Sequence, residues 1–304
     1  MTDALLPSWR PGTARDAIVA FLDGAAAVPP DDRVACFDND GTLWCERPSF
    51  AQFDFYLDAL RRRVKVDPTL GARPEFLALL GGDATAIDEL GLEQIATALA
   101  GLFEGLTPDA FAAEAQEFMR TATHSGLGRP LRSVVYQPML ELIQELHRRG
   151  FTVGVVTGGG TEFVRSISRD LYGVPAELVV GTLIGYELAR DAWDRPELHR
   201  TGSILGTANE GAAKVANIQT QVGRRPIVAG GNSGGDREML EWACAGPVPG
   251  FALVIDHDDA DREYAYEGQA QTFAEAELIT ATAERLGWTV VSMARDWDVV
   301  FPPG

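Results

Sequence analysis

The chain has 304 residues, 46% of them hydrophobic, so it can bury a large core and form one large domain or two. A formal charge of −18 argues against nucleic acid and anionic membrane surfaces as partners, because a strongly acidic protein repels both. Its three cysteines form no CxxC pair and no apolar run predicts a secretory signal or a membrane span, so we expect a soluble, cytoplasmic protein.

The first elements expected are a helix and a short strand. Residues 14–22 place apolar side chains on a helical period, and Val34–Phe37 has the length of a buried strand. It runs into Asp38-Asn39-Asp40-Gly41, which places two carboxylates where ligands bind in an open parallel sheet. Like charges so close favour a divalent cation, although a solvated turn has the same composition. An EF-hand loop does not fit, because Ser49 replaces its terminal glutamate.

Helical patterns dominate between residues 45 and 129. Apolar residues recur three or four apart in the segments Phe50–Leu60, Glu75–Leu80, Ile87–Phe103 and Pro108–Met119. We therefore expect an inserted, all-helical cap domain of about four helices over residues 45–129. The α/β core domain would then consist of residues 1–44 and 130–304.

Helices and strands alternate from residue 130 onward. The expected strands are Phe151–Val156, Leu178–Val180, Ile227–Ala229, Phe251–Ile255 and Thr289–Met293. The expected helices are Pro138–Arg149, Thr161–Leu171, Glu210–Val222, Arg237–Trp242 and Ala274–Leu286. This alternation predicts a three-layer, Rossmann-like α/β fold, with a parallel sheet covered by helices on both faces.

Three later positions carry candidate chemistry. Thr157 and Gly158 begin a glycine-rich turn, which either lets a ligand approach the backbone or is only a tight connection. Lys214, one of two lysines, lies in an expected helix, where a lysine is usually a solvated charge. Asn232 and Asp236 flank a glycine-rich turn after a strand, and Asp236 has the chemistry of a hard-cation ligand.

Asp38-x-Asp40-Gly41-Thr42-Leu43 resembles the first motif of the haloacid dehalogenase (HAD) superfamily, most of whose members are magnesium-dependent phosphatases. Thr157, Lys214 and Asp236 follow in the order of its second, third and fourth motifs. The phrase Gly-Asn-Ser-x-Gly-Asp is similar to a bacterial branch related to phosphoserine phosphatases, and the helical insertion corresponds to a C1 cap. Asn232 departs from the aspartate of many members, which puts its direct ligation of a metal in question.

The resemblance implies hydrolysis of a small phosphorylated metabolite, such as a phosphoserine-like monoester. Asp38 would attack phosphorus to form an aspartyl-phosphate while Asp40 protonates the leaving oxygen, and Asp40 would then take a proton from water. The implied Mg²⁺ ligands are Asp38, the Asp40 carbonyl, Asp236 and, directly or through water, Asn232. The phosphoryl oxygens would be bound by Thr157, Gly158 and Lys214.

Other functions fit part of this pattern. A phosphomutase of the same superfamily shares both aspartates. A phosphate-sensing receiver domain also uses Asp, Thr, Lys and Mg²⁺ on a parallel sheet, but such domains are much shorter. Dehalogenases of the superfamily lack an aspartate at the position of Asp40, and P-type ATPases carry threonine there.

The sequence does not identify the substrate. Glu46 and Arg47, just after the first motif, are either specificity residues or ordinary surface charges. The run Asp256–Asp261 is either a second metal site or a solvated loop, and the loop is favoured because consecutive acids usually face water. The residues His124, His147 and His199 show no metal-ligand spacing.

Overall fold

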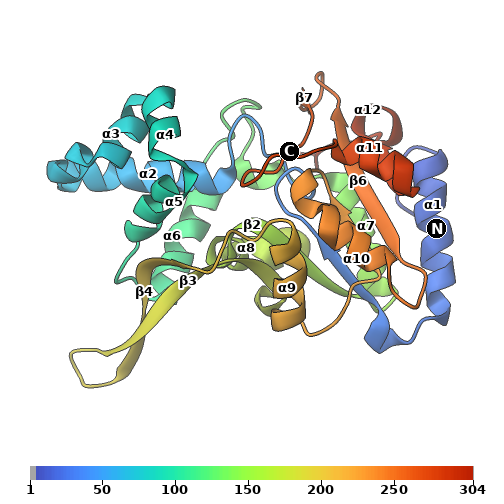
Figure 1. Ribbon diagram of the computed structural model, residues 1–304, viewed down its shortest axis with the longest axis horizontal. Helices are drawn as coiled ribbons and strands as arrows, with labels where there is room; N and C mark the ends of the chain where they lie inside the picture. The colour runs from blue at the N-terminus through green and yellow to red at the C-terminus, as the bar shows by residue number, and fades with distance from the viewer. Residues whose placement is uncertain (1–4, 304) are drawn as a thin grey trace.

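Eight strands form one sheet in this computed structural model, which describes residues 5–303 (Figure 1). They are β1 Val34–Phe37, β2 Thr152–Gly160, β3 Val179–Arg190, β4 Pro196–Leu205, β5 Val228–Gly231, β6 Phe251–Asp258, β7 Ala265–Tyr266 and β8 Thr289–Ser292. Their order is β4-β3-β2-β1-β5-β6-β7, and β8 also pairs with β6. All pairs from β3 across to β8 are parallel, while β4 and β7 are antiparallel to their neighbours, so the predicted parallel sheet is confirmed.

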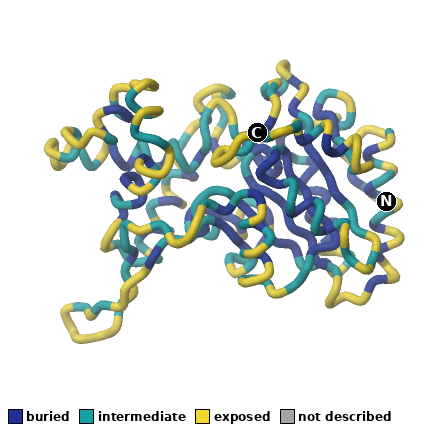
Figure 2. The backbone as a smooth tube through the Cα atoms, viewed as in Figure 1, coloured by how far each residue is buried: buried dark blue, intermediate teal, exposed yellow. Residues whose placement is uncertain are grey.

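Helices cover both faces of this sheet. Successive strand residues point to opposite faces, so apolar side chains on each face need helices to bury them. The covering helices are α1 Thr13–Gly24, α7 Gln137–Arg148, α8 Thr161–Tyr172, α9 Ala212–Gln221, α10 Arg237–Cys244 and α11 Ile279–Leu286, followed by the short α12 Met293–Asp296. Ala35 and Phe37 of β1 join one buried cluster with α1, α7 and α8, whereas Val34 and Cys36 join another with α9, α10 and α11. These two clusters, one on each face, give the predicted three layers, and the dark blue, buried backbone in Figure 2 gathers in the part of the molecule that holds the sheet.

The helical insertion contains five helices, not about four. They are α2 Ala51–Val66, α3 Pro74–Gly81, α4 Ala84–Leu90, α5 Leu92–Gly101 and α6 Pro108–Thr121. The single helix expected over Ile87–Phe103 is wrong, because Gly91 adopts φ 79° and ψ 156° and separates α4 from α5. No helix among residues 5–303 combines the length and apolar character needed to cross a bilayer.

A long hairpin, β3–β4, extends from the sheet and lies beside the insertion (Figure 1). Residues 178–180 were the only strand expected there. Arg200 of β4 forms two backbone hydrogen bonds with the insertion, from Gly105 N to its carbonyl at 2.9 Å and from its own N to Leu106 O at 2.8 Å. The hairpin therefore joins the insertion to the sheet at a second place, far in sequence from the segments that enter and leave it.

The acidic run Asp256–Asp261 is only partly the solvated loop that its composition predicts, since Asp258 and Asp261 are exposed whereas Asp259 is buried. Its first three residues belong to β6, and Asp258 accepts a hydrogen bond from Ala294 N at 2.9 Å. Asp259 is buried and pairs with Arg262. These carboxylates are satisfied by neighbouring donors, which the sequence pattern alone does not reveal.

Candidate active site

The first motif forms a tight turn at the carboxyl end of β1. Asp38 N continues the ladder toward β5 by donating to Gly230 O at 2.9 Å, and Gly41 N donates to Trp44 O at 2.9 Å. Gly41 has φ 72°, and a Cβ there would lie 2.0 Å from the Asn232 side chain. Glycine is therefore required for this turn, which fixes Asp38 and Asp40 at the sheet edge.

Lys214 lies at the centre of a buried charge cluster. Its side chain is 2% exposed, so the usual solvated position of a helical lysine does not apply here. Nζ lies 2.6 Å from Asp38 Oδ1 and 2.6 Å from Asp236 Oδ1, and it donates to Val156 O at 3.0 Å. Among the described residues, the second oxygen of Asp38 accepts no hydrogen bond. The fold thus brings the predicted residues Asp38, Lys214 and Asp236 into contact and leaves the second oxygen of Asp38 without a hydrogen-bond donor among the described residues.

The cluster holds two carboxylates against one ammonium. Burial, and then the charge of Asp236, raise the pKa of Asp38 well above its usual value, although Lys214 acts in the opposite direction. Burial by itself would lower the pKa of Lys214, but both carboxylates outweigh it and the pKa is raised. Lys214 is therefore cationic at neutral pH, and Asp38 would gain from a further positive charge nearby.

Asp40 is placed beside the predicted phosphate-binding threonine. Its Oδ1 accepts a hydrogen bond from Trp44 Nε1 at 2.8 Å, and its Oδ2 lies 3.4 Å from Thr157 Oγ1. Burial raises the pKa of Asp40, with the hydrogen bonds from Trp44 and Asn39 opposing that shift. A carboxyl group that keeps its proton to higher pH suits an acid and base role.

The glycine-rich segment predicted as a turn is the end of β2, and the insertion contacts it directly. Gly160 N donates to the side chain of Gln52, in the first turn of α2, at 2.8 Å. A Cβ on Gly159 or on Gly160 would come within 2.6 Å of Gln52. Gly158 holds the next strand, since its carbonyl accepts from Thr182 Oγ1 at 2.7 Å. Sequence reasoning missed Gln52, which nothing in its own segment distinguishes.

The two polar residues of the fourth motif, Asp236 and Asn232, contact different partners. Asp236 Oδ2 accepts from Asn232 N at 3.0 Å and from Ser233 N at 3.1 Å, so both of its oxygens are engaged by protein donors. The Asn232 side chain accepts from Thr42 Oγ1 at 3.3 Å and donates to Glu46 at 3.1 Å. Asp236 thus anchors Lys214 and its own turn, while Asn232 links the first motif to Glu46.

The sequence model of haloacid dehalogenase-like hydrolases matches residues 35–241, more than half of the chain. The chain belongs to this family. No curated protein sequence matches it. Two solved structures, a protein of unknown function from Bordetella pertussis Tohama I and a conserved functionally unknown protein from Anaerococcus prevotii DSM 20548, both have a TM-score of 0.54. The first is 20% identical and the alignment covers 85% of this chain and 97% of that one. The second is 14% identical, with coverages of 91% and 92%, and at these identities both show a shared fold only.

Glu46 and Arg47 of this HAD-like hydrolase differ in environment. Glu46 is half-buried, and burial raises the pKa of its carboxyl group, an effect that His257 partly opposes. Arg47 is exposed, and its guanidinium lies 4.6 Å from the ring centre of Tyr266. Glu46 therefore faces inward toward the fourth motif, which an ordinary surface charge would not do.

The donors at the site of this HAD-like hydrolase suit Mg²⁺, which prefers hard oxygen ligands. Asp38 and Asp236, which both contact Lys214 Nζ, could supply carboxylates, and the Asp40 backbone could supply a carbonyl. Among residues 5–303, no three His, Cys, Asp or Glu side chains gather into a metal-binding group. A cation here would thus also need the carbonyl, phosphoryl oxygens or water, and it would offset the excess negative charge around Asp38.

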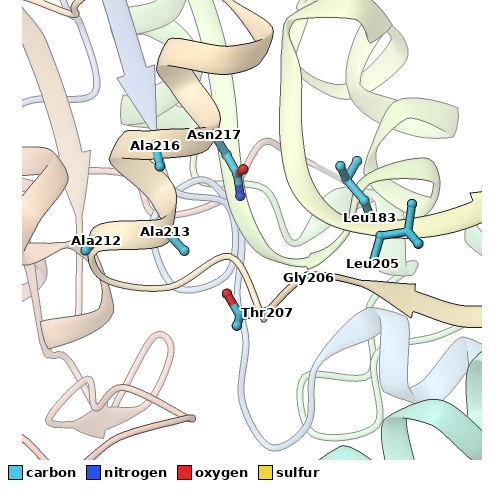
Figure 3. A pocket seen from close by; sticks show the side chains of 8 residues that line it. All are labelled: Leu183, Leu205, Gly206, Thr207, Ala212, Ala213, Ala216 and Asn217. Carbon is cyan, nitrogen blue, oxygen red and sulfur yellow. The ribbon is translucent and has the colours of Figure 1, made fainter.

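A pocket of about 430 Å³ lies between α9 and the part of the β3–β4 hairpin nearest the sheet (Figure 3). Its lining residues are Leu183, Leu205, Gly206, Thr207, Ala212, Ala213, Ala216 and Asn217. None of them is ionisable, so the pocket holds no acid, base or nucleophile. The charged cluster at Lys214, and not this pocket, is the candidate active site.

Proposed function

We propose that this HAD-like hydrolase is a Mg²⁺-dependent phosphatase that hydrolyses a small phosphorylated metabolite, a phosphoserine-like monoester, through an aspartyl-phosphate on Asp38. The observation that supports this most is the state of the Asp38 carboxylate. Lys214 Nζ orients one of its oxygens at 2.6 Å, and no described residue donates to the other. A buried carboxylate oriented in this way has a free oxygen with which to attack phosphorus.

The reaction would proceed in two displacements. The free oxygen of Asp38 forms a bond to phosphorus, the ester P–O bond breaks, and the leaving oxygen takes the proton of Asp40. Asp40, now a carboxylate, removes a proton from water, whose oxygen attacks the same phosphorus. Phosphate leaves, the Asp38 carboxylate is restored, and Asp40 is protonated again. The raised pKa of Asp40 supports its protonation at the start of the cycle.

Other residues would bind the transferring group. The ammonium of Lys214 offsets negative charge between Asp38 and the phosphoryl oxygens, and the hydroxyl of Thr157 can donate to one of those oxygens because it lies beside Asp40. A Mg²⁺ ion held by Asp38, the Asp40 carbonyl and Asp236 would supply charge neutralisation of the phosphoryl group. Asn232 would act through water, since its carboxamide already contacts Thr42 and Glu46.

Turnover of p-nitrophenyl phosphate with Mg²⁺ tests this proposal, with Asp38→Asn as the inactive control. Many turnovers per chain that disappear in Asp38→Asn support a phosphatase. One stoichiometric, stable phosphoryl label would instead indicate a receiver-like sensor. Transfer of the phosphoryl group between two hydroxyls without release of phosphate would indicate a phosphomutase. A panel of phosphorylated metabolites, phosphoserine among them, would then identify the substrate class.

A further inference from the structure

A buried histidine and glutamate lie directly behind the first motif. His257, on β6, is 3% exposed, and Glu263 is 4% exposed. Nε2 of His257 lies 2.7 Å from the carbonyl oxygen of Gly41, and Nδ1 lies 3.3 Å from Glu263 Oε2. Gly41 immediately follows Asp40, so this contact reaches the backbone of the catalytic turn itself.

The two partners of the imidazole fix where its protons lie. A backbone carbonyl can only accept, so Nε2 must carry a hydrogen and donate it to Gly41. Glu263 already receives Cys45 Sγ at 2.9 Å, the Tyr136 hydroxyl at 3.0 Å and Tyr264 N at 2.7 Å. A carboxyl group with so many donors is an acceptor, so Nδ1 also carries a hydrogen and donates it to Glu263.

The charge state of Glu263 agrees with this assignment. Burial alone would raise its pKa, but the hydrogen bond and charge of His257, followed by the contacts from Cys45 and Tyr264, lower the pKa below its usual value. Glu263 is then ionised, and it accepts from His257 Nδ1, which lies 3.3 Å away. A buried hydrogen-bonded pair in which each member has further partners holds a single orientation.

The ring is also fixed by packing. His257 stacks on Tyr266 of β7 with ring centres 4.3 Å apart and an interplanar angle of 23°. Tyr136, which immediately precedes α7, also packs against the His257 ring, with ring centres 6.1 Å apart. The histidine therefore has little freedom to follow Gly41 if the turn moves.

We propose that His257, oriented by Glu263, is a positioning residue that holds the catalytic turn Asp38–Gly41 in its productive geometry. Gly41 has no side chain of its own with which to stabilise the turn, and its carbonyl is held by an imidazole anchored on a different strand. The inference rests on the proposed phosphatase function. Within the described residues His257 contacts the catalytic turn at the Gly41 carbonyl and forms no hydrogen bond with Asp38 or Asp40, so its effect reaches the chemistry through the backbone.

Two substitutions at His257 test this. His257→Phe keeps a ring but removes both donors, and we expect kcat to fall about 10- to 100-fold with little change in KM, because a small misplacement of reacting groups costs that much. His257→Gln retains one N–H that can reach Gly41, so we expect it to recover part of the lost kcat. His199→Gln is the matched control, since His199 also pairs with a glutamate, Glu197 at 2.8 Å, on the hairpin away from the site.

The kinetic outcome separates positioning from a role in stability alone. All variants are assayed well below their own melting temperatures. A His257→Phe enzyme with a lowered melting temperature but wild-type kcat would overturn the proposal, as would equal kcat losses in His257→Phe and His257→Gln.

A second measurement does not depend on activity. In ¹⁵N-histidine-labelled protein we expect His257, assigned by its loss in His257→Gln, to show protons on both ring nitrogens, because each nitrogen faces an acceptor. A single protonated nitrogen would contradict the double-donor arrangement. If wild-type protein hydrolysed no phosphate ester while both ring protons were observed, the phosphatase function would fail and the contact with Gly41 would stand.

Discussion

Loss of Lys214 should damage both stability and turnover, and by different amounts. In Lys214→Ala, Asp38 and Asp236 lose the ammonium that lies 2.6 Å from each of them. Removing one partner from a buried ion pair costs roughly 3–5 kcal/mol of stability, less whatever Asp38 recovers by taking up a proton. Loss of one charged group from the transition state costs about 10²- to 10³-fold in kcat.

The activity of Lys214→Ala should also depend on pH in a predictable direction. Because Lys214 opposes the rise in the pKa of Asp38, its removal should raise that pKa further and leave more of the nucleophile protonated. The remaining activity of Lys214→Ala should therefore increase toward higher pH than wild-type activity does. Initial rates with p-nitrophenyl phosphate and Mg²⁺ from acidic to alkaline pH would measure it.

Two further variants complete the comparison. Lys214→Arg keeps the charge but should recover little, because a planar guanidinium does not fit where Nζ contacts three acceptors within 3.0 Å. Lys65→Ala, at an exposed position near the end of α2, should change stability by no more than about 0.5 kcal/mol and leave kcat unaltered. Equal, near-wild-type turnover by Lys65→Ala and Lys214→Ala would refute the assignment of the cationic residue.

Three other predictions concern the nucleophile, the metal and specificity. Asp38→Asn should abolish turnover. In the wild type the pKa of Asp38 is raised above 3.8, so the native state binds a proton more tightly than the unfolded state, and stability falls as pH rises through the raised pKa. Asn carries no such charge, so at neutral pH without Mg²⁺ the Asp38→Asn variant should melt no lower than wild type. A large drop in its melting temperature would contradict the charge argument. EDTA should remove activity and added Mg²⁺ should restore it, whereas full activity in verified metal-free protein would exclude a metal requirement. Glu46→Ala and Arg47→Ala should change the ranking of phosphate esters more than the common rate, and a uniform loss across a substrate panel would show that neither selects the substrate.

The local pattern of the sequence determined the α/β core and the order of its chemical positions. Apolar runs of strand length, each followed by a helical period, were enough to predict the parallel sheet, because burial on both faces leaves a direct mark on composition. The short strand before Asp38 and the glycine-rich turns after Val156 and Ala229 also indicated which side chains lie at the carboxyl edge of the sheet. Those signals are local in the chain.

Other features were not predicted from the sequence, for reasons that differ from one to the next. The hairpin β3–β4 depends on contacts of Arg200 with residues 105 and 106, which no window around it contains. The split at Gly91 depends on a single backbone conformation, and the helical period continues across it. Asp259 looks solvated in sequence but is buried in the fold and pairs with Arg262, whereas Asp258 stays exposed and accepts a hydrogen bond from Ala294 N, in a different segment.

The candidate site divides in the same way. The sequence by itself identified Asp38, Asp40, Lys214 and Asp236 as candidate site residues. Their residue types, and their places at strand ends or in a helix, can be read from the local sequence. Only the tertiary structure decided that Lys214 is buried between two carboxylates, because its position 176 residues after Asp38 says nothing of their separation. It likewise brought His257 against the Gly41 carbonyl across 216 residues, since the strand order β1-β5-β6 brings the ends of β1 and β6 near each other and no local pattern reveals that order.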